Sequence, residues 1–169
     1  MTDHFKLLQL PTHPLQKHIP LELEMAREIT RDNVSAELLK ARFEEAGYEA
    51  KIEEDGSIYL PGTWINLRVI LYPDHACLVI RGQLALNTEL SDEELQKISW
   101  EANYKSFMLR YVTHRWDDGD VGLFGNYVLY YTFGLNMPNL IFSLRKFVDT
   151  FKAFYEENKS DERMFPRSV

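Results

Sequence analysis

Residues 64–86 read WINLRVILYPDHACLVIRGQLAL, and this stretch determines the class of fold. Apolar residues alternate with other residues in two runs, Trp64–Tyr72 and Ala76–Leu86. Alternation with a period of two is typical of β-strands, and Pro73-Asp74 between the runs favours a tight turn. The stretch therefore predicts an antiparallel β-hairpin.

Two further hairpins are predicted, one before this stretch and one after it. Asp55-Gly56 lies between two short alternating runs and is a strong signal for a two-residue turn. The tetrapeptide Asp117-Asp118-Gly119-Asp120 lies between two longer runs, Phe107–Trp116 and Val121–Gly134. Aspartate and glycine are the residues that tight turns require, so we expect both pairs of runs to form hairpins.

Helical spacing of apolar residues marks two segments outside these hairpins. The first helix is expected to begin at Asp32 or Asn33, either of which can cap it, and to end at Ala46. A second helix is expected to open with Ser91 and Glu94, which have the spacing of a capping box.

A third helix completes the predicted domain. It is expected to run from Pro138 to about Glu157, with a wide apolar stripe along one side. We divide the chain into an amino-terminal arm (1–29), an α+β domain (30–157) and a polar, frayed carboxy-terminal tail (158–169). The predicted fold is an antiparallel β-sheet with helices packed on one face, in the order α-ββ-ββ-α-ββ-α.

Composition limits the partners and the compartment. With 19 basic and 26 acidic residues, the chain carries a formal net charge of −7, which disfavours contact with the phosphates of nucleic acid. A single cysteine, Cys77, excludes an intramolecular disulfide and fits a reducing compartment. No segment approaches the roughly 18 apolar residues of a membrane span. We expect a cytoplasmic protein with no nucleic-acid or membrane partner.

Strand alternation gives the predicted sheet two faces of different composition. The side assigned to the helices is nearly all apolar: Ile65, Leu67, Val69, Leu71, Leu78, Ile80, Leu84, Leu109, Tyr111, Leu123, Tyr127, Leu129, Tyr131 and Phe133. The other side mixes aromatic, aliphatic and arginine residues: Trp64, Arg68, Ile70, Tyr72, Val79, Arg81, Met108, Arg110, Val112, His114, Trp116, Phe124, Val128 and Tyr130.

The mixed side has the composition of a protein-binding surface. Aromatic residues, methionine and arginine are enriched at interfaces, and an uncovered apolar patch of this extent favours aggregation. We expect a second copy or another protein to cover it, with contacts centred on Ile70, Tyr72, Val112, Trp116, Val128 and Tyr130. The alternative is that the amino-terminal arm or a helix covers this side.

Acidic and glycine residues in the last hairpin suggest two kinds of ligand site. The three carboxylates of residues 117–120 invite a divalent cation, but the closing glutamate of a calcium loop is missing and a plain turn explains them. Gly119, Gly122 and Gly125 recur every third residue, as in some phosphate loops. No Lys-Ser or Lys-Thr pair follows and no helix opens there, so we expect a bulge or close packing instead.

Histidine and cysteine residues give weak candidates for metal binding and catalysis. His13 and His18 share no helical face and have no cysteine partner, so a zinc site is not expected. Cys77 and His114 are conceivable as a thiolate and its base, but an inert packed thiol is the simpler interpretation. No cluster of ionisable residues indicates an active site, so we expect neither an enzyme nor a cofactor or metal site.

Several features together resemble a known family. They are a leading helix ending in Gly47-Tyr48, the acidic Glu53-Glu54-Asp55-Gly56 hairpin, a capped helix with Asn103 near its end, the Asp118-Gly119 hairpin and a long final helix. Residues 30 to 157 resemble the bacterial sensory-transduction regulators (YbjN-like proteins), whose fold is like that of type III secretion chaperones. The resemblance implies a non-enzymatic, often dimeric module that acts through protein contacts.

The leading hypothesis is a homodimeric regulator or chaperone-like adaptor that binds a partner segment on the mixed face or at a free sheet edge. The alternative is a small-molecule binding module whose pocket lies between the last helix and the sheet, near Phe147 and Tyr131.

Overall fold

The computed structural model describes residues 28–161 and 163–165. In this part of the chain, α-helices pack on one face of a six-stranded antiparallel sheet, as predicted. The elements in chain order are β1 (Glu28–Ile29), α2 (Ala36–Glu45), β2 (Lys51–Ile52), β3 (Ile58–Leu60), β4 (Leu67–Tyr72), a 3-10 turn (Pro73–His75), β5 (Cys77–Ala85), α3 (Asp92–Lys105), β6 (Arg110–Arg115), β7 (Val121–Tyr130), β8 (Leu135–Asn136) and α4 (Met137–Asn158).

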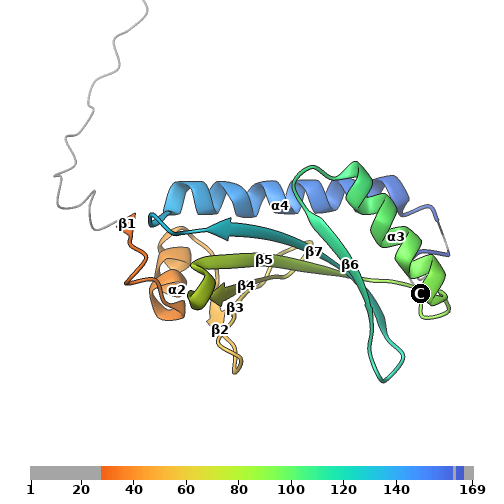
Figure 1. Ribbon diagram of the computed structural model, residues 1–169, viewed down its shortest axis with the longest axis horizontal. Helices are drawn as coiled ribbons and strands as arrows, with labels where there is room; N and C mark the ends of the chain where they lie inside the picture. Colours follow the sequence, from red (N-terminus) through yellow and green to blue (C-terminus); the bar gives the residue numbers. More distant parts are fainter. Residues whose placement is uncertain (1–27, 162, 166–169) are drawn as a thin grey trace, which may run out of the picture.

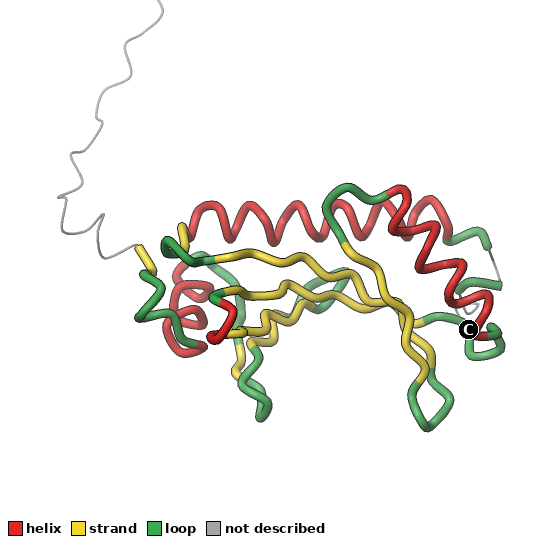
Figure 2. Tube along the Cα trace, in the orientation of Figure 1, coloured by secondary structure: helices red, strands yellow, loops and turns green. Residues whose placement is uncertain are grey.

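Helix α4 runs along the length of the sheet, with α2 near one of its ends and α3 near the other (Figure 1). The strand order is β2-β3-β4-β5-β7-β6. The turns joining β2 to β3 and β6 to β7 extend on the side away from α4 (Figure 2). A separate short pairing of β1 with β8 was not predicted; it brings Ile29, from the end of the predicted arm, opposite Leu135.

The helix ends follow local capping chemistry. Glu94 and Ser91 form the predicted capping box at the start of α3, and Gly47 after α2 has the left-handed φ of +87°. The predicted start of α2 at Asp32 or Asn33 is wrong. Ser35 is the cap, because its hydroxyl accepts a hydrogen bond from the Leu38 amide at 3.1 Å.

Two glycines let α4 approach the sheet closely. Gly82 of β5 lies opposite Gly125 of β7, and the rings of Phe147 and Phe151 pack over them. A Cβ atom on Gly82 would lie 2.8 Å from the Phe147 ring, and one on Gly125 would lie 3.1 Å from the Phe151 ring. Both phenylalanines are fully buried, so this helix–sheet contact forms the centre of the core.

Residues 163–165 are more ordered than the polar composition around them predicts. Met164 and Phe165 are both buried, and the Met164 carbonyl accepts a hydrogen bond from the Asn87 amide at 3.0 Å. The Phe165 ring lies 5.1 Å from that of Tyr155 on α4. The prediction of a frayed tail is therefore wrong for residues 163–165, because these two apolar side chains fold back onto the domain.

Candidate protein-binding face

The outer face of the sheet is the side turned away from α4, and strand register fixes its composition. Its side chains come from alternate residues of β4, β5, β7 and β6: Arg68, Ile70, Tyr72, Cys77, Val79, Arg81, Gln83, Ala85, Phe124, Asn126, Val128, Tyr130, Arg110, Val112 and His114. No element of the described residues is paired or packed over this face as α4 is over the other one.

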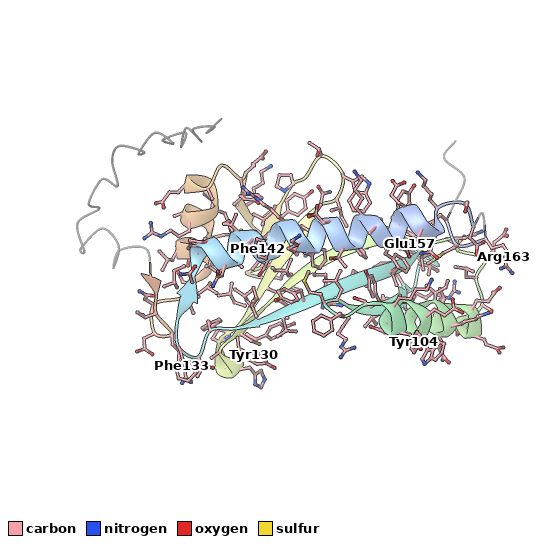
Figure 3. All side chains as sticks on the ribbon, turned by 90° about the horizontal axis from the view of Figure 1, so that it is seen from above. Tyr104, Tyr130, Phe133, Phe142, Glu157 and Arg163 are labelled. Atoms are coloured by element: carbon pink, nitrogen blue, oxygen red, sulfur yellow. The ribbon has the colours of Figure 1, made fainter. Side chains whose placement is uncertain are left out.

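The first apolar group on this face, which we call the tyrosine patch, consists of Ile70, Tyr72, Val79, Val128 and Tyr130. The register sets Ile70 opposite Val79 and Val79 opposite Val128, so the three aliphatic side chains form one row across the sheet. Tyr130 is 73% exposed, and Tyr72 and Val128 are about 40% exposed. Figure 3 shows Tyr130 near the end of β7.

The second apolar group, which we call the hairpin patch, consists of Val112, Trp116 and Phe124. It lies where β6 and β7 approach their turn. Val112 is 53% exposed and lies opposite Phe124. The Trp116 ring packs edge-on against Phe124 at 5.6 Å and against His114 at 5.1 Å. A Cβ atom on Gly122 would lie 2.7 Å from the Trp116 ring, so this glycine makes room for the indole.

A polar row separates the two patches. Arg68, Arg81, Asn126 and Arg110 lie side by side on four adjacent strands. The Arg81 Nε atom donates a hydrogen bond to Asn126 Oδ1 at 2.8 Å, and the guanidinium lies 5.5 Å from the centre of the Phe124 ring. Apolar patches that flank arginines on aromatic rings are typical of protein interfaces.

The six residues predicted to form the binding surface all belong to this side of the sheet, but in two groups. Ile70, Tyr72, Val128 and Tyr130 lie in the tyrosine patch, whereas Val112 and Trp116 lie in the hairpin patch. Val128 and Phe124 are four residues apart on β7, which places the patches about 13 Å apart. The alternation of residues therefore placed these six side chains on the correct side of the sheet. The strand register, which divides them into two groups, could not be read from the sequence.

Three residues were assigned to the wrong environment. Trp64 packs edge-on against Tyr155 of α4 at 5.9 Å, and Met108 packs against the core, although both were placed on the outer face. Phe133 was placed in the core and is fully exposed. All three lie beyond the ends of their strands, where alternation no longer determines the direction of a side chain.

The edge of the sheet at β6 is closed by side chains of α3. Asn103 Oδ1 accepts a hydrogen bond from the Tyr111 amide, and Asn103 Nδ2 donates one to the Tyr111 carbonyl, both at 2.8 Å. The Ser99 hydroxyl accepts another from the Thr113 amide at 3.0 Å. A partner strand therefore cannot pair with the backbone of Tyr111 or with the amide of Thr113.

Comparison with known proteins supports the architecture. No protein-family model and no curated protein matches the chain. Among solved structures it is similar to the crystal structure of YbjN, a proposed transcription regulator from E. coli, with a TM-score of 0.66 and 12% sequence identity over 79% of this chain and 97% of that chain. The chain has a YbjN-like fold. At this identity the similarity concerns the fold alone.

The YbjN-like fold here also carries exposed aromatic residues that the sequence interpretation missed. Trp100 and Tyr104 of α3 stack at 5.7 Å and are 67% and 81% exposed, and Phe107 beyond the helix is fully exposed. Figure 3 shows Tyr104 on the outer side of α3. Trp100 and Tyr104 are four residues apart, so they share the helical face opposite the buried Leu95 and Ala102. This spacing in the sequence could have indicated an exposed aromatic pair.

The remaining candidate sites have structural explanations. Residues 117–120 form a tight turn in which Gly119 has a φ of +94° and its amide donates to the Trp116 carbonyl at 3.0 Å. Cys77 pairs with Tyr130 and His114 with Gly122, so they lie about 27 Å apart along β7, too far for a catalytic pair. His13 and His18 lie outside the described residues.

The residues that the structure describes offer neither a metal-binding cluster nor a membrane-spanning helix. They contain no group of three or more His, Cys, Asp or Glu side chains arranged to hold a metal ion. None of their helices is both long and apolar enough to cross a membrane. At the place suggested for a small-molecule pocket, Phe147 is fully buried against Gly82, and so its ring fills the space between α4 and β5.

Proposed function

We propose that this chain is a non-enzymatic, cytoplasmic regulator or chaperone-like adaptor that acts as a homodimer and binds protein through the outer face of its sheet. The observation that carries the proposal is the tyrosine patch, where Tyr130, Tyr72 and Val128 remain 73%, 40% and 42% exposed. Burial of apolar surface stabilises association by about 25 cal/mol per Å². Contact with a second protein surface would therefore be favourable, because it removes the tyrosine patch from water.

A second copy of the chain is the partner that we propose for the tyrosine patch. A twofold-symmetric interface uses the same patch on both subunits, so it must be self-complementary. The row Ile70, Val79 and Val128 is apolar across three strands, and its tyrosines have a polar hydroxyl at the rim. The description of YbjN as a proposed transcription regulator supports a regulatory role, without naming what it contacts.

The test compares substitutions on the two sides of the sheet. Val128→Asp and Tyr130→Asp each place a charge in the tyrosine patch, and we expect each to weaken dimerisation at least tenfold because a buried unpaired charge is costly. Phe142→Asp is the matched control, since Phe142 is 60% exposed on α4. Size-exclusion chromatography with light scattering gives the mass, and thermal melting confirms folding.

The result that contradicts the proposal is equally specific. Dimers that persist in both patch variants, or that dissociate only in Phe142→Asp, would place the interface elsewhere on the molecule. The exposed Trp100 and Tyr104 would then be the next surface to test.

A further inference from the structure

Strand β5 extends beyond its neighbour β4 and leaves an open edge. The pairing of these strands ends at Leu67 and Gly82, whereas β5 continues to Ala85. On its other side, β5 stays paired with β7 through Gln83, Leu84 and Ala85. These three residues therefore have no strand partner on the β4 side among the described residues, and we call this place the β5 notch.

The β5 notch contains a cavity that is lined by aromatic and cationic residues. The cavity has a volume of about 600 Å³, and its lining includes Gly82, Gln83 and Ala85 of β5 together with Trp64, Asn66, Phe124 and Arg81. Tyr59 of β3 and Arg68 of β4 also line it. This volume lies within the range of ligand-binding clefts.

The charge of the β5 notch is opposite to that of the chain. No carboxylate belongs to its lining, although the net charge of the whole chain is −7. Arg81 contacts the Asn126 amide and the Phe124 ring and has no carboxylate partner among the described residues. Arg68 lies 3.4 Å from Asp55, but both side chains are about half exposed, which makes this a weak pair.

We propose that the β5 notch binds an extended, acidic segment of a partner protein, which continues the line of β4 and pairs antiparallel with residues 83–85. Main-chain hydrogen bonds to a free edge supply affinity, and side-chain pockets supply specificity. This inference rests on the proposed protein-binding function, but it uses residues outside the tyrosine patch.

The register predicts the pattern of the bound segment. Residues opposite Gln83 and Ala85 point to the outer face, where Arg81 and Arg68 are placed to receive carboxylates. The residue opposite Leu84 points to the helix side, towards Ile65 in the lining. We therefore expect acidic residues to alternate with apolar ones.

Fluorescence polarisation with the 169-residue chain tests this pattern. The probe is a fluorescein-labelled hexapeptide that alternates aspartate with valine, and the comparison peptides replace aspartate by lysine or methylate the backbone nitrogens. We expect saturable binding of the aspartate peptide only. Equal binding of the lysine peptide would overturn the charge argument, and equal binding of the methylated peptide would overturn strand addition.

Variants of the chain locate the site. Arg81→Gln and Arg68→Gln are each expected to weaken binding of the aspartate peptide about tenfold, since each removes a charge-assisted hydrogen bond. Arg145→Gln, which removes an exposed cation from α4, is expected to have no effect. Arg68 is 47% exposed, so its replacement tests the site even if Arg81→Gln does not fold.

The outcome is separable from that of the dimer proposal. The Tyr130→Asp variant is expected to bind the aspartate peptide as the unchanged chain does, whether or not it dimerises. Binding that survives both arginine replacements would contradict the β5 notch as the site. Loss of binding in Tyr130→Asp together with loss of dimers would assign the peptide to the dimer interface instead.

Discussion

Asn103 of α3 hydrogen-bonds both backbone groups of Tyr111 in the edge strand β6, each at 2.8 Å. One side-chain amide thus takes the place that a neighbouring strand would occupy. An exposed edge strand is a template for pairing with other chains, so this contact restricts association to other parts of the molecule. It also joins α3 to the sheet.

Replacing Asn103 by alanine should therefore destabilise the fold. Two backbone groups of the buried Tyr111 lose their partners, which costs about 2 kcal/mol in the free energy of unfolding. Urea denaturation measures this cost, and light scattering is expected to show slow aggregation through β6. Gln96→Ala on the exposed side of α3 is the control for helix propensity. Equal stability of the two variants would refute a role for the Asn103 contacts.

Gly82→Ala should also destabilise the fold, for a steric reason. The added Cβ would lie 2.8 Å from the Phe147 ring and 2.9 Å from the end of the Ile65 side chain, so these buried side chains must shift. Overpacking of this kind costs about 1–3 kcal/mol. Phe147→Leu in the same chain is expected to recover part of the loss, which a double-mutant cycle of urea denaturation measures. If the two substitutions change the free energy of unfolding additively, the added Cβ at position 82 does not clash with the Phe147 ring.

Tyr131→Phe is expected to stabilise the protein. The Tyr131 side chain is 1% exposed, and its hydroxyl has no hydrogen-bond partner among the described residues. Burial raises the pKa of this phenol, as expected for a group in apolar surroundings. Removing the hydroxyl should add about 1 kcal/mol to the free energy of unfolding. Tyr104→Phe, at an exposed phenol, should change nothing, and a loss of stability in Tyr131→Phe would reveal a partner for the hydroxyl.

The capping box of α3 predicts a dependence of stability on pH. Hydrogen bonds from the Ser91 amide and hydroxyl, both at 2.8 Å, lower the pKa of Glu94 below its ordinary value of 4.5. The contribution of Glu94 is complete above that ordinary value and is lost as the pH falls through the lowered one.

Glu94→Gln should consequently flatten the acid side of the stability profile. Urea midpoints measured from about pH 6 to about pH 3 should fall less in this variant than in the unchanged chain. Glu93→Gln removes a charge from the same turn without the capping contacts, so it should leave the slope unchanged. Identical slopes in all three proteins would exclude this contribution.

Local signals in the sequence predicted most of the fold. Gly47, Gly56 and Gly119 all adopt the positive φ that their turns and helix ends required, and Ser91 caps α3 as its spacing indicated. Such signals depend on a few neighbouring residues. They were sufficient to predict the order of the helices and hairpins, which the structure confirms.

Features that depend on contacts between distant residues could not be predicted. The pairing of β5 with β7 joins Arg81 to Asn126, and this register divides the predicted surface into the tyrosine and hairpin patches. The β5 notch likewise results from β5 being longer than β4, a difference of a few residues at strand ends. Alternation assigns a face within a strand, but it does not align one strand with another.

Sedimentation equilibrium of the unchanged 169-residue chain, from nanomolar to tens of micromolar concentration, tests most directly whether a second copy covers the tyrosine patch. The predicted result is a reversible shift from the mass of one chain to that of two, with a dissociation constant in the micromolar range or below. A single-chain mass at every concentration would contradict the homodimer, and with it the cover proposed for Tyr130 and Val128.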